Sequence, residues 1–203
     1  MKTITLSIAI ALLFTLSINT TSFASTKSNN VETILNNVSN FSNIEVNGNV
    51  ELYVTTGEAN NVKIYDSYYN QNALVQEQNG VLRISSYKNE KLVVWVTVAE
   101  LRSITASDNA TIKSFGTLSA IDFKLNLKNN ATAQLSLDVS NASIALNDNA
   151  KANLSGFAGE SVVAVNTTAH LNTAQLTAGK NEVQSTVVMA SANASADEFA
   201  GIE

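Results

Sequence analysis

The sequence contains no cysteine and no proline, and it has one histidine and one tryptophan among 203 residues. Without cysteine, the chain can form neither a disulfide bond nor a thiolate metal site, and it cannot carry a lipid on cysteine. The absence of proline suits long strand ladders, because proline removes a backbone hydrogen-bond donor. The composition therefore predicts a fold that depends on an extensive apolar core, with no metal ion and no cofactor.

Charge is also sparse and slightly negative. Twelve Lys and Arg residues stand against 17 Asp and Glu residues, which gives a net charge of −5, and the charges form no block. A nucleic-acid-binding surface needs a basic stripe, and an anionic membrane surface attracts a basic helix face. The sequence therefore argues against both kinds of partner.

The N-terminus resembles a secretory signal peptide over residues 1–24. Lys2 precedes the apolar run "ITLSIAIALLFTLSI", and "SFA" places small residues at the two positions that a signal peptidase recognises. We expect cleavage between Ala24 and Ser25. The protein would then be exported across the inner membrane to the periplasm, the cell surface or the extracellular space. No later apolar run is long enough to predict a stable membrane span.

Residues 25–40 are polar, with one local pattern. Val31, Ile34, Leu35 and Val38 follow the spacing of one helix face. The interpretations are a short helix that caps the core and a polar leader without regular structure. Residues 41–203 form the predicted single domain.

After Phe41, apolar residues alternate with polar ones, as expected for short strands. A polar triplet followed by alanine then recurs at intervals of about 20 residues. Asn and Asp adopt left-handed backbone more easily than most residues, which a sharp corner requires. The segments are "ITASDNATI", "LNLKNNATAQL", "IALNDNAKANL", "VAVNTTAHL" and "VMASANASA", with Ala110, Ala131, Ala150, Ala169 and Ala194 aligned.

A repeat of about 20 residues with two short strands is typical of a solenoid, in which stacked turns share one core. We therefore predict an all-β, right-handed parallel β-helix-like solenoid with turns of about 20 residues; its handedness comes from the resemblance given next. An antiparallel sandwich is the competing fold. The residues predicted to lie inside are Ile112, Leu127, Leu135, Leu146, Leu154 and Leu171.

The segments "FSNIEVNGNVELYVTTGEANNVKIY", "NGVLRIS" and "LVVWVTVAELRSITASDNATI" resemble the bacterial putative auto-transporter adhesin head GIN domains. The resemblance extends from Phe41 to the C-terminus. It implies a right-handed parallel β-helix similar to pectin lyases, and a role in adhesion at the cell surface. This chain has Asn-Ala corners where the family tends to have Gly-rich ones.

No catalytic motif is evident. His170 occupies an outward slot after a corner alanine, and Asp108 and Asp148 lie in corner triplets that Asn130 would separate by one turn. The two arginines, Arg83 and Arg102, do not recur with acids as a polysaccharide-cleaving site would require. We predict a non-catalytic envelope or surface module; the alternative is an enzyme acting on polysaccharide.

Four aromatic residues are candidates for ligand binding. Alternation places Tyr53 and Trp95 outside the core, and Tyr65 and Tyr87 lie on strands that neighbour theirs in the sequence. Exposed rings on a flat sheet can stack on sugars or anchor a protein partner. The alternative is that the rings pack under residues 25–40 or under a loop. The sequence leaves open whether the ligand is a glycan or a protein, and it does not determine the oligomeric state.

Overall fold

The computed structural model describes residues 32–35, 38, 40–66, 73–166 and 168–185, and every regular element among them is a strand. The predicted signal peptide and its cleavage site at Ala24 and Ser25 lie outside these residues. The strands are β1 (Glu32–Ile34), β2 (Asn43–Asn47), β3 (Val50–Thr56), β4 (Asn61–Tyr65), β5 (Ala73–Gln78), β6 (Val81–Ser86), β7 (Leu92–Val98), β8 (Ser103–Ala106), β9 (Thr111–Leu127), β10 (Thr132–Leu146), β11 (Lys151–Val165) and β12 (His170–Ser185). The prediction of an all-β fold is confirmed.

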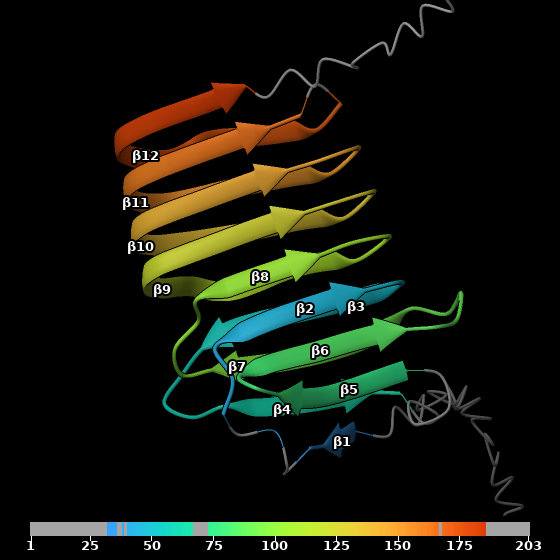
Figure 1. The fold of residues 1–203 in the computed structure, drawn as a ribbon. Coiled ribbons are helices and arrows are strands. Elements are labelled where there is room, and N and C mark those ends of the chain that lie inside the picture. The colour runs from blue at the N-terminus through green and yellow to red at the C-terminus, as the bar shows by residue number, and fades with distance from the viewer. Residues whose placement is uncertain (1–31, 36–37, 39, 67–72, 167, 186–203) are drawn as a thin grey trace, which may run out of the picture.

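The strands form one sheet that curls around the core, so that two walls face each other (Figure 1). The front wall contains β2, β5, β6, β8 and the C-terminal parts of β9 to β12. The back wall contains β1, β3, β4, β7 and the N-terminal parts of β9 to β12. Each of the long strands β9 to β12 bends from the back wall to the front wall at one side of the stack.

Parallel pairing in a constant register builds the upper part of the stack. Thr132 pairs with Lys151 and Leu146 pairs with Val165, so β10 and β11 keep one offset along their whole length. The pairing of β9 with β10 is interrupted once. Gln134 pairs with Lys113 but Ser136 pairs with Thr117, because β9 carries a bulge of extra residues between these two pairs. This bulge explains why the first interval between corner alanines is longer than the next two.

The lower part of the stack does not follow the order of the chain. β2 pairs with β6 on one side and with β8 on the other, and β3 lies between β7 and β9 in the same way. Strands β2 and β3, which precede β4 to β12 in the chain, therefore lie in the middle of the stack (Figure 1). The sequence repeat did not predict this insertion.

The lower end of the stack consists of antiparallel strands, and the predicted helix in residues 25–40 is wrong. Residues 32–34 form strand β1, which pairs antiparallel with β4. Val38 is 3% exposed and Leu35 packs against the core, whereas Ile34 is 47% exposed. The alternation of a strand explains the contrast between Ile34 and Leu35, because adjacent residues point to opposite faces. Val31 lies outside the described residues.

The core lies between the two walls, and the residues predicted to point inward do point inward. Ile112, Leu127, Leu135, Leu146 and Leu154 are at most 1% exposed. Leu171 is partly buried and packs against the same core. It lies in β12, which pairs with β11 alone among the described strands. Each fully buried aliphatic side chain contributes about 1.5–3 kcal/mol, so this core is the main source of stability.

The polar corners adopt the backbone that the triplets predict. The middle residues Asp108, Asn129 and Asp148 have φ angles of 59°, 58° and 57°. The amide of the following alanine donates to the carbonyl three residues earlier, as from Ala131 to Lys128 at 3.1 Å. Ala110, Ala131 and Ala150 are fully buried, so little room exists for a larger side chain inside the bend. Ala194 lies outside the described residues.

Gly156 is required where β11 passes close to β10. Its φ is +99°, and a Cβ atom there would lie 2.1 Å from the carbonyl oxygen of Leu137. Gly116, in the bulge of β9, has a similar φ of +83°, but a Cβ atom there would meet nothing within 4 Å. A comparison of the two glycines therefore distinguishes the free-energy cost of a left-handed backbone from the cost of a clash with the neighbouring strand.

We predict that Gly156→Ala lowers the free energy of unfolding more than Gly116→Ala does. A left-handed conformation costs a residue with a Cβ about 1–2 kcal/mol, which both variants share. The clash with Leu137 adds a further cost of about 1–3 kcal/mol to Gly156→Ala alone. Urea denaturation of both variants measures the difference, and equal losses would show that β10 and β11 are not packed this closely.

Candidate functional site

An aromatic surface lies on the outside of the back wall. Tyr53 of β3 and Trp95 of β7 are register partners, and their rings stack with centroids 4.5 Å apart and planes inclined by 16°. Phe115 of β9 meets Trp95 edge to face, with centroids 5.5 Å apart. We call Tyr53, Trp95 and Phe115 the aromatic platform.

Strand alternation places the platform outside. In β3, Leu52 and Val54 are fully buried, so Tyr53 between them points away from the core. In β7, Val94 and Val96 are buried on either side of Trp95. Parallel pairing of β3 with β7 then brings the two rings to adjacent positions, where aromatic cross-strand pairs stabilise the sheet.

A charged cluster borders the platform. The carboxylate of Glu51 accepts hydrogen bonds from Lys113 Nζ at 2.6 Å and from the Tyr53 hydroxyl at 2.9 Å, and Lys91 Nζ lies 3.2 Å from it. The Glu51 side chain is only 13% exposed. The hydrogen bond from Lys113 is the main cause that lowers the pKa of Glu51 to about 2, with smaller contributions from Tyr53 and Lys91. The same bond raises the pKa of Lys113.

Lys113 also contacts the platform directly. Its Nζ atom lies 5.5 Å from the centroid of the Tyr53 ring, within the range of a cation–π interaction. Tyr53 and Lys113 are register partners on β3 and β9. The site therefore combines flat apolar rings with a fixed cationic group at one side.

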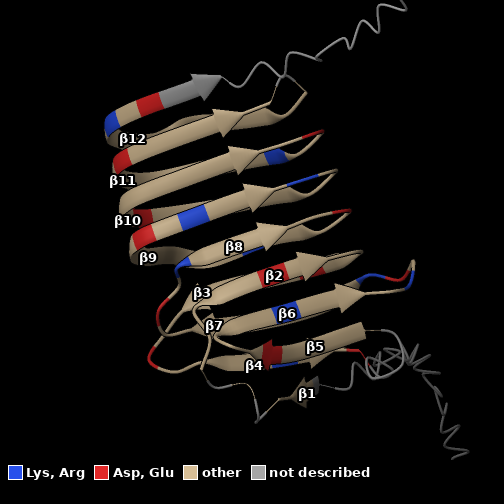
Figure 2. Cartoon of the chain, viewed as in Figure 1, with Lys and Arg blue, Asp and Glu red and all other residues tan. Residues whose placement is uncertain are grey.

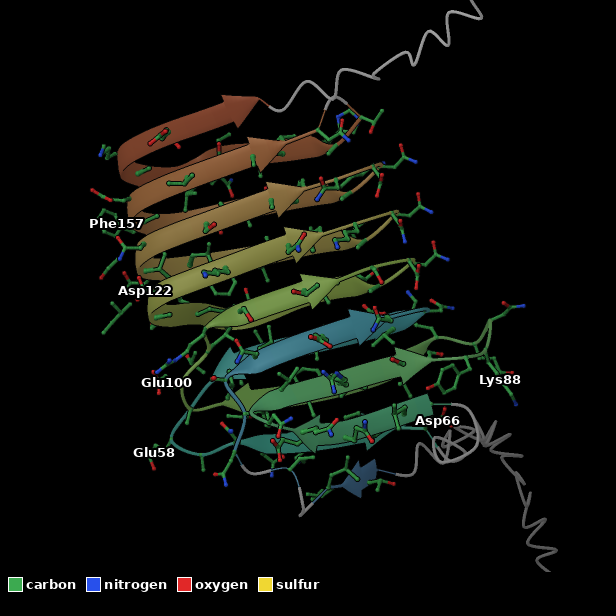
Figure 3. The ribbon with its side chains drawn as sticks, in the orientation of Figure 1. Glu58, Asp66, Lys88, Glu100, Asp122 and Phe157 are labelled. Atoms are coloured by element: carbon green, nitrogen blue, oxygen red, sulfur yellow. The ribbon has the colours of Figure 1, made fainter. Side chains whose placement is uncertain are left out.

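Of the four predicted aromatic residues, the structure brings two together. Tyr65 ends β4 on the same face as Lys63, the register partner of Trp95, but it lies two residues further along the strand. Tyr87 follows β6 of the front wall and is 70% exposed, away from the platform. Its neighbour Lys88 projects from the corner side of the stack (Figure 3).

Phe115 and Lys113 were not among the site residues predicted from the sequence. The outward parity of Lys113 follows from the buried Ile112 beside it, so alternation could have identified the lysine. Phe115 lies in the bulge of β9, where alternation no longer applies. No pattern in the sequence indicates that its ring turns toward Trp95.

The corner acids form a structural ladder. Asn129 donates from Nδ2 to Asp108 Oδ1 at 2.8 Å, and its backbone amide donates to Asp148 Oδ2 at 3.1 Å. The residue between the two acids is thus Asn129, and the expectation of Asn130 was wrong by one position. No group of three or more His, Cys, Asp or Glu side chains in the described part of the chain could hold a metal ion. His170 is exposed beside the last described corner, at the register position of Lys151.

A second surface feature is an open groove of about 1710 Å³ along the bent side of the stack, near Glu100, Asp122 and Phe157 (Figure 3). Three of the four acids that line it contact neighbouring side chains. Glu100 binds Arg102 at 2.6 Å, Asp122 accepts a hydrogen bond from Asn141 at 2.8 Å, and Glu160 lies 3.9 Å from Lys180. The contacts of Asp122 and Glu160 link adjacent strands, whereas Glu100 and Arg102 lie in one loop.

The fold and the site define an all-β protein with a stacked sheet and an outward aromatic surface. The chain belongs to the family described as putative auto-transporter adhesin, head GIN domain, whose sequence profile matches residues 40–197. The resemblance that we identified in the sequence is thereby confirmed. A comparison with curated proteins gave no match. Among the residues that the structure describes, no helix has the length and apolar character to cross a membrane.

Several solved structures share the fold. A putative adhesin from Bacteroides fragilis NCTC 9343 has a TM-score of 0.68 and 15% identity, over 75% of this chain and 74% of its own. A putative adhesin from Parabacteroides distasonis ATCC 8503 has a TM-score of 0.57 and 12% identity, over 75% and 76%. A putative lipid binding protein from the same organism has a TM-score of 0.54 and 12% identity, over 75% and 76%. At these identities the similarity establishes the fold alone.

We predict that Glu51 makes stability depend on pH in the acid range. Because its folded-state pKa of about 2 lies below the ordinary value of 4.5, its contribution is complete above pH 4.5 and is lost as the pH falls through about 2. Glu51→Gln should cost about 1–3 kcal/mol near neutral pH, the scale of hydrogen bonds to a charged group.

The measurement is urea denaturation of the wild type and the variant between neutral pH and pH 2. The difference between their free energies of unfolding should disappear over the lower half of that pH range. Glu45→Gln is the control, because Glu45 pairs with Arg83 on the front wall and its side chain is 42% exposed. A gap for Glu51→Gln that does not change with pH would contradict the assignment.

Proposed function

We propose that this protein is a non-catalytic, adhesin-like module of the cell envelope or cell surface that binds a glycan on the aromatic platform. The observation that carries the proposal is the stacked pair of Tyr53 and Trp95 on the outside of the back wall, with Lys113 beside it. Sugar rings present flat C–H faces that pack on aromatic rings, while their hydroxyl groups need polar neighbours. Membership of an adhesin family supports a role in binding.

The surroundings of the platform favour a glycan over a protein partner. Thr55 and Thr97 flank the two rings at register positions on the same strands, and their hydroxyl groups can donate and accept hydrogen bonds. A protein-binding surface would be centred on a buried apolar cluster surrounded by a polar rim. Here the rings alternate with polar side chains along a flat sheet.

The proposal that the protein is non-catalytic rests on the contacts that its acidic groups already make. Glu51, the acid nearest to the platform, has its carboxylate held by Lys113 and Lys91, and its low pKa suits neither a general acid nor a general base near neutral pH. The paired carboxylates that glycoside cleavage needs are absent from this site among the described residues. The alternative is a polysaccharide-acting enzyme on a pectin-lyase-like fold.

We interpret β8 to β12 as successive turns of a right-handed parallel β-helix with about 20 residues per turn. Paired residues of β9, β10 and β11 lie about 20 residues apart in the chain, which supports this interpretation. The insertion of β2 and β3 between β6, β7 and β8, β9 departs from a solenoid built in chain order.

The cellular location is proposed from the N-terminal sequence and the family. Residues 1–24 resemble a signal peptide that ends at Ala24, which would export the chain across the inner membrane. An adhesin-like module acts at the outer face of a cell or in its envelope. A surface glycan or a surface protein is the expected partner, and nucleic acid is not.

We predict that Trp95→Ala weakens glycan binding and that Trp95→Phe preserves much of it. Loss of one stacked ring should weaken binding about tenfold or more, which corresponds to about 1.4 kcal/mol. The measurement is a glycan array followed by titration of the best ligand. Phe157→Ala is the matched control, because Phe157 is an exposed ring on the bent side of the stack.

Three other outcomes would contradict the proposal. Binding to a cell-surface protein that Trp95→Ala removes, with no glycan bound on the array, would assign the platform to a protein partner. Cleavage of an acidic polysaccharide by the purified wild-type protein would support the enzyme instead. Glycan binding that is insensitive to Trp95→Ala would place the site elsewhere.

A further inference from the structure

The proposed function leaves open which class of glycan is bound and how it lies on the protein. We infer that the ligand is an anionic polysaccharide that runs along the stack axis of the back wall, across a row of seven register-matched side chains. This inference rests on the proposed function, because it uses the aromatic platform as part of the row. The seven residues, which we call the outer row, are Lys63, Trp95, Tyr53, Lys113, Gln134, Asn153 and Asn172.

Strand register places the outer row in a line. Each member is the direct partner of the next across β4, β7, β3, β9, β10, β11 and β12. Neighbouring strands lie about 4.8 Å apart, so six steps span roughly 29 Å. One strand spacing is close to the length of one sugar ring in an extended chain. Each successive sugar ring of a polysaccharide can therefore lie over one residue of the outer row.

The two ends of the row offer different chemistry. Trp95 and Tyr53 supply aromatic surface near one end, while Gln134, Asn153 and Asn172 supply amide groups toward the other. All three amide residues are exposed. Within the described part of the chain, the side chains of Gln134 and Asn153 make no hydrogen bond. Primary amides donate and accept at once, which matches the hydroxyl groups of a sugar.

The charged residues of the back wall indicate which class of polysaccharide binds. The chain has a net charge of −5, but the outward back-wall positions of β3, β4, β7 and β9 to β12 carry Lys63, Lys113 and Lys151, and Lys91 reaches the same face. Glu51, an acid on the same face, is bonded to Lys113 and Lys91, and the exposed acids Asp122, Asp138 and Glu160 lie toward the bent side of the stack. A basic excess on one face of an acidic protein favours an anionic ligand by charge complementarity.

The front wall lacks this arrangement. Among its strands, β2 carries Glu45, β6 carries Arg83, and β8 carries no charged residue (Figure 2). Glu45 pairs there with Arg83 at 2.9 Å. Lys124 of β9 lies on this wall, between Ser103 and Ser143 in register, without an aromatic row beside it. The front wall therefore provides a control surface on the same molecule.

The chemistry points to polymers of uronic acids or of sulfated sugars. Their carboxylate or sulfate groups can pair with Lys63 and Lys151, their ring faces can stack on Trp95, and their hydroxyl groups can bond the amides. Single-stranded nucleic acid also combines negative charge with flat rings. A sugar polymer is the better match, because the amide half of the row has no ring on which a base could stack.

The test measures binding of the whole chain, without its predicted signal peptide, to a series of oligogalacturonates from disaccharide to octasaccharide. The matched neutral probe is the same series as methyl esters, and a single-stranded oligonucleotide is a further probe. We expect affinity for the acidic series to rise with length and to fall with added salt. The methyl esters should bind about tenfold or more weakly.

Two sets of variants locate the ligand. Lys63→Gln with Lys151→Gln should reduce affinity for the acidic octasaccharide about tenfold and leave the methyl ester unaffected. Asn153→Ala with Asn172→Ala should weaken the octasaccharide and not the disaccharide. Lys124→Gln, which removes the same charge from the front wall, should change neither. Circular dichroism of each variant checks that the fold is retained.

The outcomes separate this inference from the proposed function. Equal binding of acidic and neutral oligosaccharides that Trp95→Ala abolishes would overturn the inference and keep the platform as a glycan site. Affinity that does not depend on length would overturn the row in the same way. Tighter binding of the oligonucleotide than of the acidic oligosaccharides would show that the ligand is a nucleic acid and not a polysaccharide. Absence of any Trp95-dependent binding to a glycan would overturn both.

Discussion

The in-register hydrogen-bond ladder between parallel strands is the constraint on which the other features depend. Once β10 and β11 are fixed in one constant register, equivalent positions of successive strands lie directly above one another. Inward positions must then share one packed core, and corners must share one left-handed backbone, as at Asn129 and Asp148. The same rule applies outside the core, where it aligns residues that lie far apart in the sequence into rows.

Much of this arrangement could be predicted because it is periodic. Alternation of apolar and polar residues identifies the inside of each strand, which explains why the burial of Leu127 and Leu146 was predicted correctly. The spacing of the corner alanines gives the offset between paired strands in the upper stack. The outward position of Tyr53 and Trp95 follows from the same alternation, and their adjacency follows only from the pairing of β3 with β7.

The remaining features depend on pairings between segments that carry no local signal. Nothing in the sequence of β2 and β3 indicates that they enter the middle of the stack, because they show the same alternation of apolar and polar residues as the other short strands. Phe115 reaches Trp95 through a bulge, where period-two patterns fail. Residues 32–34 have apolar neighbours at helical spacing, yet the free edge of β4 provides hydrogen-bond partners that only a strand can use.

Strand register assembles the aromatic platform around Trp95, which is the single tryptophan of the chain. Its fluorescence therefore reports on this surface alone. During titration with an acidic oligosaccharide, we expect Trp95 emission to change with the same saturation curve as binding measured by calorimetry, and quenching by acrylamide to decrease. Calorimetric saturation with unchanged Trp95 emission and unchanged quenching would show that the ligand binds away from this surface.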